Sequence, residues 1–245
     1  MTATVGRTRT RGIETLSLDS PDTRNALSAA LVTALADALT DCAEDPDVRA
    51  VVLTHTGSTF CAGADLRDPP HPDALVGLLR QILDLRKPVV ARVTGHVRAG
   101  GLGLLAACDL AAATTTSTFA FTEVRIGVAP AVISLSVIPR ADPRALARYY
   151  LTGERFDAPE AVRVGLLTTA ADDVDDALAP ILDGLRRSSP QGLAETKQLL
   201  TTRVLQTFDR DAADLTALSA RLFSSAQAQE GMTAFLQRRD AAWVV

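Results

Sequence analysis

The stretch RVTGHVRAGGLGLLAACDL, residues 92–110, decides the fold of this chain. Three glycines fall within four positions, between a run that favours a β-strand and an alanine-rich run that favours a helix. Ordering a glycine costs conformational entropy, so this cluster indicates that another group must approach the backbone closely. A helix that starts on glycines after a strand also presents free N–H groups, and its dipole favours negative charge there.

The whole chain has 245 residues, of which 47% are hydrophobic, and a net charge of −4. This length predicts one large domain, or one domain with a small appendage. The mildly acidic balance gives no electrostatic footprint for nucleic acid, so we expect no nucleic-acid partner, and no apolar run reaches the roughly 18 residues of a membrane span. The N-terminus has no apolar signal-peptide segment. The three cysteines and three histidines show no metal-ligand spacing and no CxxC, so we expect no metal and a cytoplasmic protein.

The order of elements predicts an α/β protein. Strands and helices alternate in the first part, which indicates stacked parallel sheets with crossover helices. The predicted strands cover 12–20, 48–57, 87–95 and the extended run 110–121, and the predicted helices cover 28–45, 73–86 and a short segment that ends near Asp109. From Pro143 onward the pattern is nearly all helical. We predict a core over 1–187 and a helical region over 188–245, which is too amphipathic to stand alone and should pack on another subunit.

The glycine cluster has several interpretations. The glycines could simply allow a helix to pack closely on a sheet. A phosphate-binding P-loop is excluded, because Leu104 and Leu105 stand where the Lys-Ser/Thr pair is needed. GLGLLA, residues 101–106, satisfies the dinucleotide-binding fingerprint, with Glu123 about twenty residues further on. Against it, threonines interrupt the segment before Glu123, and a second small-residue loop stays unexplained.

That second loop is FCAGAD, residues 60–65, which also follows a buried strand. Two such loops, behind two strands of one sheet system, can each offer one N–H group to the same oxygen. This arrangement is an oxyanion hole, which stabilises negative charge developing on a carbonyl oxygen.

At this point the chain resembles a known family, the enoyl-CoA hydratase/isomerase or crotonase superfamily. The likeness covers nearly the whole chain, and the order and spacing of its motifs carry it. These motifs are SPDTRNALS (20–28), GSTFCAGADLRD (57–68), KPVVARVTGHVRAGGLGLLAACDLA (87–111), STFAFTEVRIGVAPAV (117–132), YYLTGERFDAPEAVRVGLL (149–167), SPQGLAETKQLL (189–200) and EGMTAFLQRRDAAW (230–243). The resemblance implies a spiral of ββα units that forms stacked sheets, with C-terminal helices that mediate homotrimers, often paired into hexamers.

The resemblance also implies a coenzyme A thioester as the ligand, with no separate cofactor. The oxyanion donors would be the N–H groups of Ala64 and Gly100. The turn 24–26 and the loop 61–66 would line the slot for adenine and pantetheine, with Arg24 as a phosphate contact. The residues expected on this side of the site are Arg24, Ala26, Ala62, Asp65 and Leu66.

The chain departs from the family pattern at one catalytic position. The family's hydratases carry two glutamates, one three residues after the oxyanion glycine and one in the loop after the next strand. The first position is Gly103 here, and the second is Glu123. We expect the missing side chain to leave a gap at Gly103, which would hold part of the acyl group or an ordered water. Asp109 and Asp65 are expected to be structural, and His96 and Arg98 to lie on a loop surface.

These observations predict an enoyl-CoA hydratase-type lyase with Glu123 as its single acid–base group. Two alternatives stay open. The first is a Δ3,Δ2-enoyl-CoA isomerase, which needs only one glutamate. The second is a non-catalytic acyl-CoA-binding subunit that has kept the fold. The sequence does not identify the acyl group.

Overall fold

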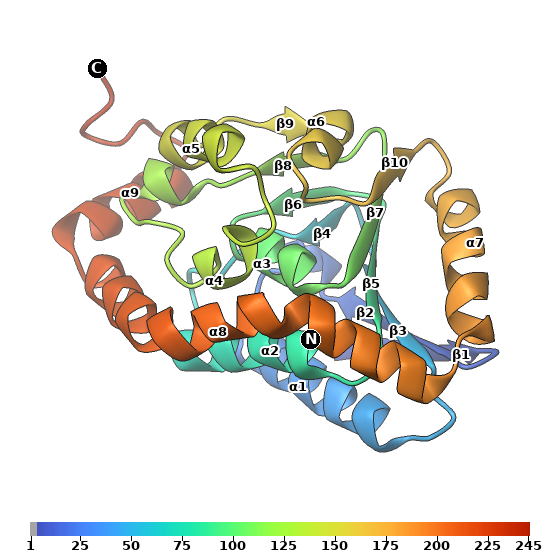
Figure 1. The fold of residues 1–245 in the computed structure, drawn as a ribbon. Helices are drawn as coiled ribbons and strands as arrows, with labels where there is room; N and C mark the ends of the chain where they lie inside the picture. Colours follow the sequence, from blue (N-terminus) through green and yellow to red (C-terminus); the bar gives the residue numbers. More distant parts are fainter. Residues whose placement is uncertain (1–3) are drawn as a thin grey trace.

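The computed structural model describes residues 4–245, which form two β-sheets surrounded by helices (Figure 1). The larger sheet contains, in spatial order, β1 (Thr4–Thr10), β2 (Ile13–Asp19), β3 (Ala50–His55), β5 (Val89–Val93), β7 (Leu110–Thr114) and β10 (Thr169–Ala171). The smaller sheet contains β4 (Thr59–Cys61), β6 (His96–Arg98), β8 (Thr118–Ala120) and β9 (Phe156–Asp157). Neighbouring strands run parallel except in the pairs β1–β2 and β8–β9. The predicted parallel sheets with helical crossovers are confirmed.

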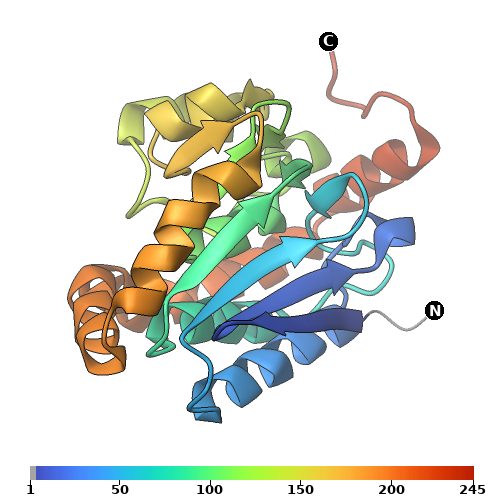
Figure 2. The ribbon, with the colours of Figure 1, turned by 90° about the vertical axis from the view of Figure 1, so that its right-hand side faces the viewer.

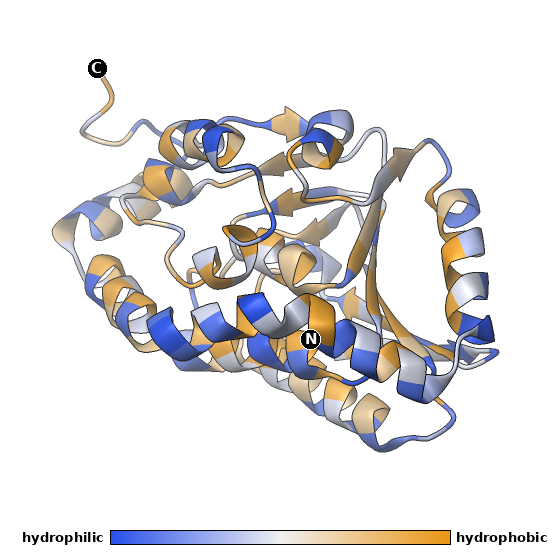
Figure 3. Ribbon diagram, in the orientation of Figure 1, coloured by the Kyte–Doolittle hydropathy of each residue, from blue (hydrophilic) through white to orange (hydrophobic). Residues whose placement is uncertain are grey.

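The helices cover both faces of the larger sheet (Figures 1 and 2). In chain order they are η1 (Pro21–Thr23), α1 (Ala29–Glu44), α2 (Pro72–Asp84), α3 (Gly100–Ala107), η2 (Glu123–Ile126), α4 (Ser134–Val137), α5 (Pro143–Thr152), α6 (Ala158–Arg163), α7 (Val174–Arg187), α8 (Pro190–Phe223) and α9 (Ala226–Gln237). The main hydrophobic core lies on the side of α1, α2 and α3, and α7 covers the opposite face. Because both faces are covered, apolar residues are concentrated on the central strands (Figure 3), and every residue of β3 is buried.

Helix α1 shows how the sequence pattern produces an element. Ser28 caps its start, because the Ser28 hydroxyl accepts a hydrogen bond from the N–H of Leu31 at 3.2 Å. The predicted apolar stripe, which includes Leu31, Leu35 and Leu39, is fully buried against the core. Strand β1, in contrast, was not expected, because its TVGRTRT sequence lacks alternating apolar residues. It is an edge strand that pairs with β2 along its whole length, and Arg7 and Arg9 both form ion pairs with Glu14 of β2, at 3.1 and 2.7 Å.

The long helix α8 packs along α2 within its own chain, and this contact covers part of its apolar surface. Val204 and Phe208 join the main hydrophobic core. The ammonium of Lys197 is buried, and it contacts the carboxylate of Asp109 at 2.8 Å and donates to the carbonyl of Ile82 at 2.7 Å. The structural role expected for Asp109 is thus confirmed. Within residues 4–245, no helix combines the length and the apolar character that crossing a bilayer requires.

Candidate active site

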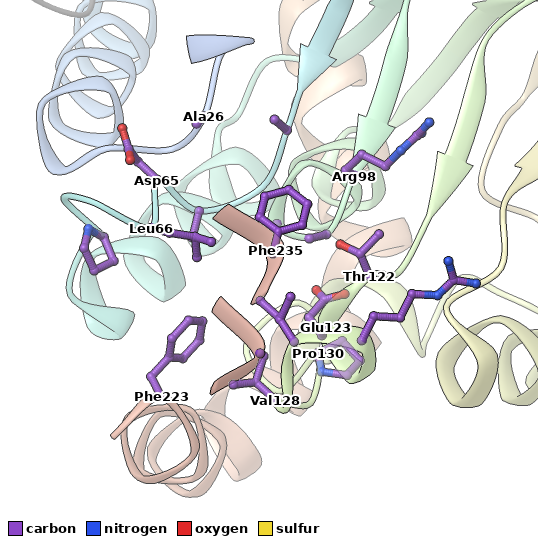
Figure 4. A pocket seen from close by; sticks show the side chains of 18 of the residues that line it. Ala26, Asp65, Leu66, Arg98, Thr122, Glu123, Val128, Pro130, Phe223 and Phe235 are labelled. Atoms are coloured by element: carbon purple, nitrogen blue, oxygen red, sulfur yellow. The ribbon is translucent and has the colours of Figure 1, made fainter. Parts of the chain in front are cut away.

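A cavity of about 970 Å³ lies where the two loops singled out in the sequence meet the C-terminal helices (Figure 4). The start of α3 and the loop 62–70 form one side of it. Helix η2 and the segment 128–133 form another side, and the end of α8, helix α9 and the C-terminal tail complete the wall. Elements distant in the sequence therefore build one site.

The two loops come together as the oxyanion interpretation requires. Leu27 clamps the first loop, because its N–H donates to Gly63 O at 2.7 Å and its carbonyl accepts from Asp65 N at 2.9 Å. A Cβ atom on Gly100 would lie 3.7 Å from the backbone nitrogen of Ala64, so the two residues are neighbours on the cavity wall. Among the described residues, neither the Ala64 N–H nor the Gly100 N–H donates to a backbone carbonyl. Two adjacent donors are thus available to a ligand oxygen.

The sharp turn from β6 into α3 depends on a strained residue and on close packing. Ala99 has φ 46° and ψ −120°, a region that non-glycine residues rarely occupy and that costs about 1–3 kcal/mol. A Cβ atom on Gly101 would lie only 2.7 Å from the Cβ of Cys61 in β4. Close packing of helix on sheet is therefore the reason for Gly101, whereas Gly100 lies at the cavity beside Ala64. The dinucleotide fingerprint does not explain this arrangement.

Glu123 is the first residue of η2, and its side chain forms part of the cavity wall near Thr122 and Pro130 (Figure 4). It is 8% exposed, and its Oε2 atom has no hydrogen-bond partner in the part of the chain that the structure describes. Burial without a cationic neighbour disfavours the ionised form, and this raises the pKa of Glu123 to about 7. A carboxyl group of this kind can both take up and release a proton near neutral pH.

The gap expected at Gly103 does not exist. A Cβ atom on Gly103 would lie 2.5 Å from Cγ2 and 3.0 Å from Cβ of Ile133, so this side chain fills the space. Gly103 itself is not among the residues that line the cavity, whereas Ile133 is, with 3% exposure. The physical reason is that α4 packs directly on the side of α3 that has no side chain at residue 103. The Ser136 hydroxyl fixes this contact by donating to Gly103 O at 3.0 Å.

The other residues expected at the site do line the cavity: Arg24, Ala26, Ala62, Asp65 and Leu66. Asp65 also stabilises its own turn, since its Oδ1 accepts a hydrogen bond from Arg67 N at 3.0 Å. Asn25 is buried behind this wall, and its Nδ2 donates to the carbonyls of Thr56 and Thr59. It therefore holds the turn that carries Arg24 and Ala26.

Arg98 was expected on a loop surface, and this expectation is wrong. Arg98 lies on strand β6, lines the cavity, and donates from its guanidinium to the hydroxyl of Thr118 at 2.7 Å. Burial, together with the positive charges of Arg155 and Arg24, lowers the pKa of Arg98 to about 10. These three arginines line the cavity, and within residues 4–245 none of them forms an ion pair. Such a cluster suits an anionic ligand.

Sequence reasoning also missed the residues that come from the C-terminal part of the chain. Phe223 at the end of α8 and Phe235 of α9 line the cavity (Figure 4), as does Trp243 of the tail. Phe235 is 57% exposed, so it adds apolar surface to the cavity wall. No local signal marks these residues, because tertiary packing brings them to the site, as the packing of α9 against η2 does for Phe235.

Comparisons with known proteins identify the family and the fold. The profile of a family described as enoyl-CoA hydratase/isomerase matches residues 8–244. The chain is 32% identical over 250 residues to the mitochondrial enoyl-CoA hydratase domain-containing protein 3 of Danio rerio, covering 95% of this chain and 84% of that protein. It is 28% identical to (E)-benzylidenesuccinyl-CoA hydratase of Thauera aromatica, covering 93% and 94%. A crystal structure of an enoyl-CoA hydratase from Mycobacterium avium superposes with a TM-score of 0.93 at 50% identity, covering 100% of both chains.

Proposed function

The chain belongs to the enoyl-CoA hydratase/isomerase family and has its crotonase fold, and from this premise we propose that it is a hydratase-type lyase for an α,β-unsaturated acyl-CoA. Glu123 would be its single acid–base group. One observation carries the proposal: a buried carboxyl group with an unpartnered oxygen shares a cavity with two free, adjacent backbone N–H groups.

The N–H groups of Ala64 and Gly100 would bind the thioester oxygen. Negative charge develops on this oxygen when the double bond is attacked, and each donor of such a hole contributes about 100- to 1000-fold in rate. Glu123 would take a proton from water while the water oxygen bonds to the β-carbon. The electron pair of the double bond then moves toward the thioester as an enolate. The same carboxyl group returns the proton to the α-carbon, which regenerates Glu123 and yields the 3-hydroxyacyl-CoA.

The coenzyme A portion would follow the other wall of the cavity. Arg24 is a phosphate contact in this proposal, and Arg98 and Arg155 add unpaired positive charge beside it. Ala26, Ala62, Asp65 and Leu66 would line the slot for adenine and pantetheine. We further propose a homotrimer, or a hexamer of two trimers, to cover Leu199 and Leu200 of α8, which are 80% and 71% exposed. Light scattering after size-exclusion chromatography measures this state.

A second candidate function, Δ3,Δ2-enoyl-CoA isomerisation, is favoured by the loss of the first family glutamate and by Ile133 in its space. In this reaction Glu123 would remove a proton from the α-carbon of a 3-enoyl thioester. The C–H electron pair forms the dienolate, and the carboxyl group returns the proton to the γ-carbon. No water is consumed.

A panel of short, long and branched 2-enoyl- and 3-enoyl-CoA thioesters tests both candidates. Hydration consumes the absorbance of the conjugated enoyl thioester, whereas isomerisation of the 3-enoyl compound creates it. We expect E123Q to lose at least about 100-fold in kcat. The matched control is E44Q, which changes an exposed glutamate at the end of α1. Thioester binding with no turnover of any compound, and no effect of E123Q, would instead support the non-catalytic binding subunit.

A further inference from the structure

We propose that Ile133 determines how much water takes part in the reaction, and therefore sets the ratio of hydration to isomerisation. This inference rests on the proposed function and deepens it. Ile133 lines the cavity that holds Glu123, and its side chain occupies the space into which a side chain at residue 103 would project. It thus closes the site at the position where a second acid–base group, or a water in its place, would enter.

The position of Ile133 is firmly held. The Ser136 hydroxyl donates to Gly103 O at 3.0 Å, which anchors α4 to α3, and Val137 N donates to Ile133 O at 2.9 Å, which holds Ile133 at the start of α4. Ser136 is completely buried. A β-branched side chain is also stiff at χ1. The Cγ2 methyl group of Ile133 therefore cannot easily turn away from α3 to admit another group.

The wall next to Ile133 has apolar side chains, so a water that takes the place of Ile133 would depend on Glu123. The segment 128–133 has the sequence VAPAVI, and its side chains are apolar without exception. The cavity-lining residues Val128, Val132 and Ile133 are at most 6% exposed. A buried water needs two to four polar partners, so a water admitted here would have to bind Glu123, whose Oε2 is unpartnered, and backbone groups. The same wall explains why burial raises the pKa of Glu123.

Removal of the Cγ2 methyl group of Ile133 is the direct test. In I133A both methyl-bearing branches are lost and only Cβ stays near Gly103. We expect the ratio of hydration to isomerisation to rise about tenfold, because a water gains room in the cavity that Ile133 shares with Glu123. The control is I133V, which keeps the Cγ2 methyl group that blocks residue 103 and should keep the wild-type ratio. The pH profile gives a second readout: water beside Glu123 relieves its desolvation, so the acidic limb of kcat/KM should move to lower pH in I133A and not in I133V.

A double substitution tests whether the space that Ile133 fills can instead hold an acid–base side chain at residue 103. G103E alone places a Cβ atom 2.5 Å from Ile133 Cγ2, so this variant should lose stability and activity together. In G103E/I133A the closest remaining neighbour is the Cβ of residue 133 at 3.0 Å, which requires a shift of a few tenths of an ångström. This variant should regain a folded state, measured by its Tm, and should hydrate 2-enoyl-CoA faster than I133A, since a second positioned acid–base group contributes about 100-fold or more.

The outcomes separate this inference from the proposed function. If wild-type protein neither hydrates nor isomerises any thioester of the panel, the proposed function is wrong. If wild-type protein is active, but I133A is folded and keeps the wild-type product ratio and pH profile within twofold, Ile133 does not control access of water, and the inference is wrong while the proposed function stands. A G103E variant with wild-type stability would contradict the packing on which the inference depends.

Discussion

Substitution of Gly101 is a sensitive test of the oxyanion site, because Gly101 does not contact the substrate in the proposed mechanism and can act only by displacing Gly100. A Cβ atom at this residue would lie 2.7 Å from Cys61 Cβ, 3.0 Å from Cys61 O and 3.1 Å from Cys61 Sγ. Carbon atoms in contact prefer about 3.5–4.0 Å. G101A therefore has to move the start of α3 away from β4 by about 1 Å, and Gly100 moves with it.

The expected magnitudes follow from this displacement. Overpacking of a well-packed core costs about 1–3 kcal/mol of unfolding free energy. Loss of one oxyanion donor costs about 100- to 1000-fold in kcat, which is about 2.7–4 kcal/mol in the transition state. We expect KM to change much less than kcat, because the hole binds charge that develops only during the reaction.

The control for G101A is another glycine-to-alanine substitution in a helix. Gly77 lies on the exposed side of α2, and a Cβ atom there would have no neighbour within 4 Å. G77A should leave kcat unchanged and raise the unfolding free energy by about 0.5–1 kcal/mol. Urea unfolding and steady-state kinetics of the enoyl-CoA reaction measure both variants. If folded G101A keeps the kcat of the wild type, the start of α3 does not position a catalytic N–H group and the reasoning fails.

The remaining predictions concern other parts of the molecule. Burial raises the pKa of Glu123 from 4.5 to about 7, so the folded state binds this proton more tightly than the unfolded state does. The protein is therefore less stable when Glu123 is ionised, and this stability is lost as pH rises from about 4.5 through 7. E123Q should therefore be more stable than wild type at pH 8 by up to about 3 kcal/mol and equal to it at pH 4, in urea unfolding; an equal difference at both pH values would contradict this. K197M removes one partner of a buried ion pair and should cost about 3–5 kcal/mol of unfolding free energy, whereas K87M changes a more exposed lysine and should cost less. R98M should raise KM for coenzyme A thioesters several-fold but leave KM for pantetheine thioesters unchanged, since only the former carry the nucleotide phosphates; equal effects on both would place Arg98 away from the phosphates.

Much of the fold and part of the site could be predicted from local patterns. The stripe of Leu31, Leu35 and Leu39 predicts the buried face of α1, and the continuous apolar run 48–57 predicts a strand covered on both faces. These predictions succeed because the periodicity of apolar residues directly encodes which face of an element leaves water. The glycine cluster and FCAGAD likewise mark where backbone must stay accessible, and Ala64 and Gly100 do lie side by side.

Only the tertiary structure decided what surrounds these positions. The absence of a side chain at Gly103 is equally compatible with a gap and with close packing. In the structure Ile133, thirty residues later in the chain, fills the space. Likewise, Arg98 lines the cavity from strand β6, which pairs with β8, and Phe235 reaches it because α9 packs on η2. A sequence pattern can predict that one face of an element is buried or that its backbone is exposed, since burial and exposure of this kind are properties of a single segment. Which side chain occupies a given volume depends on the mutual packing of several segments, and this is a property of the whole folded chain.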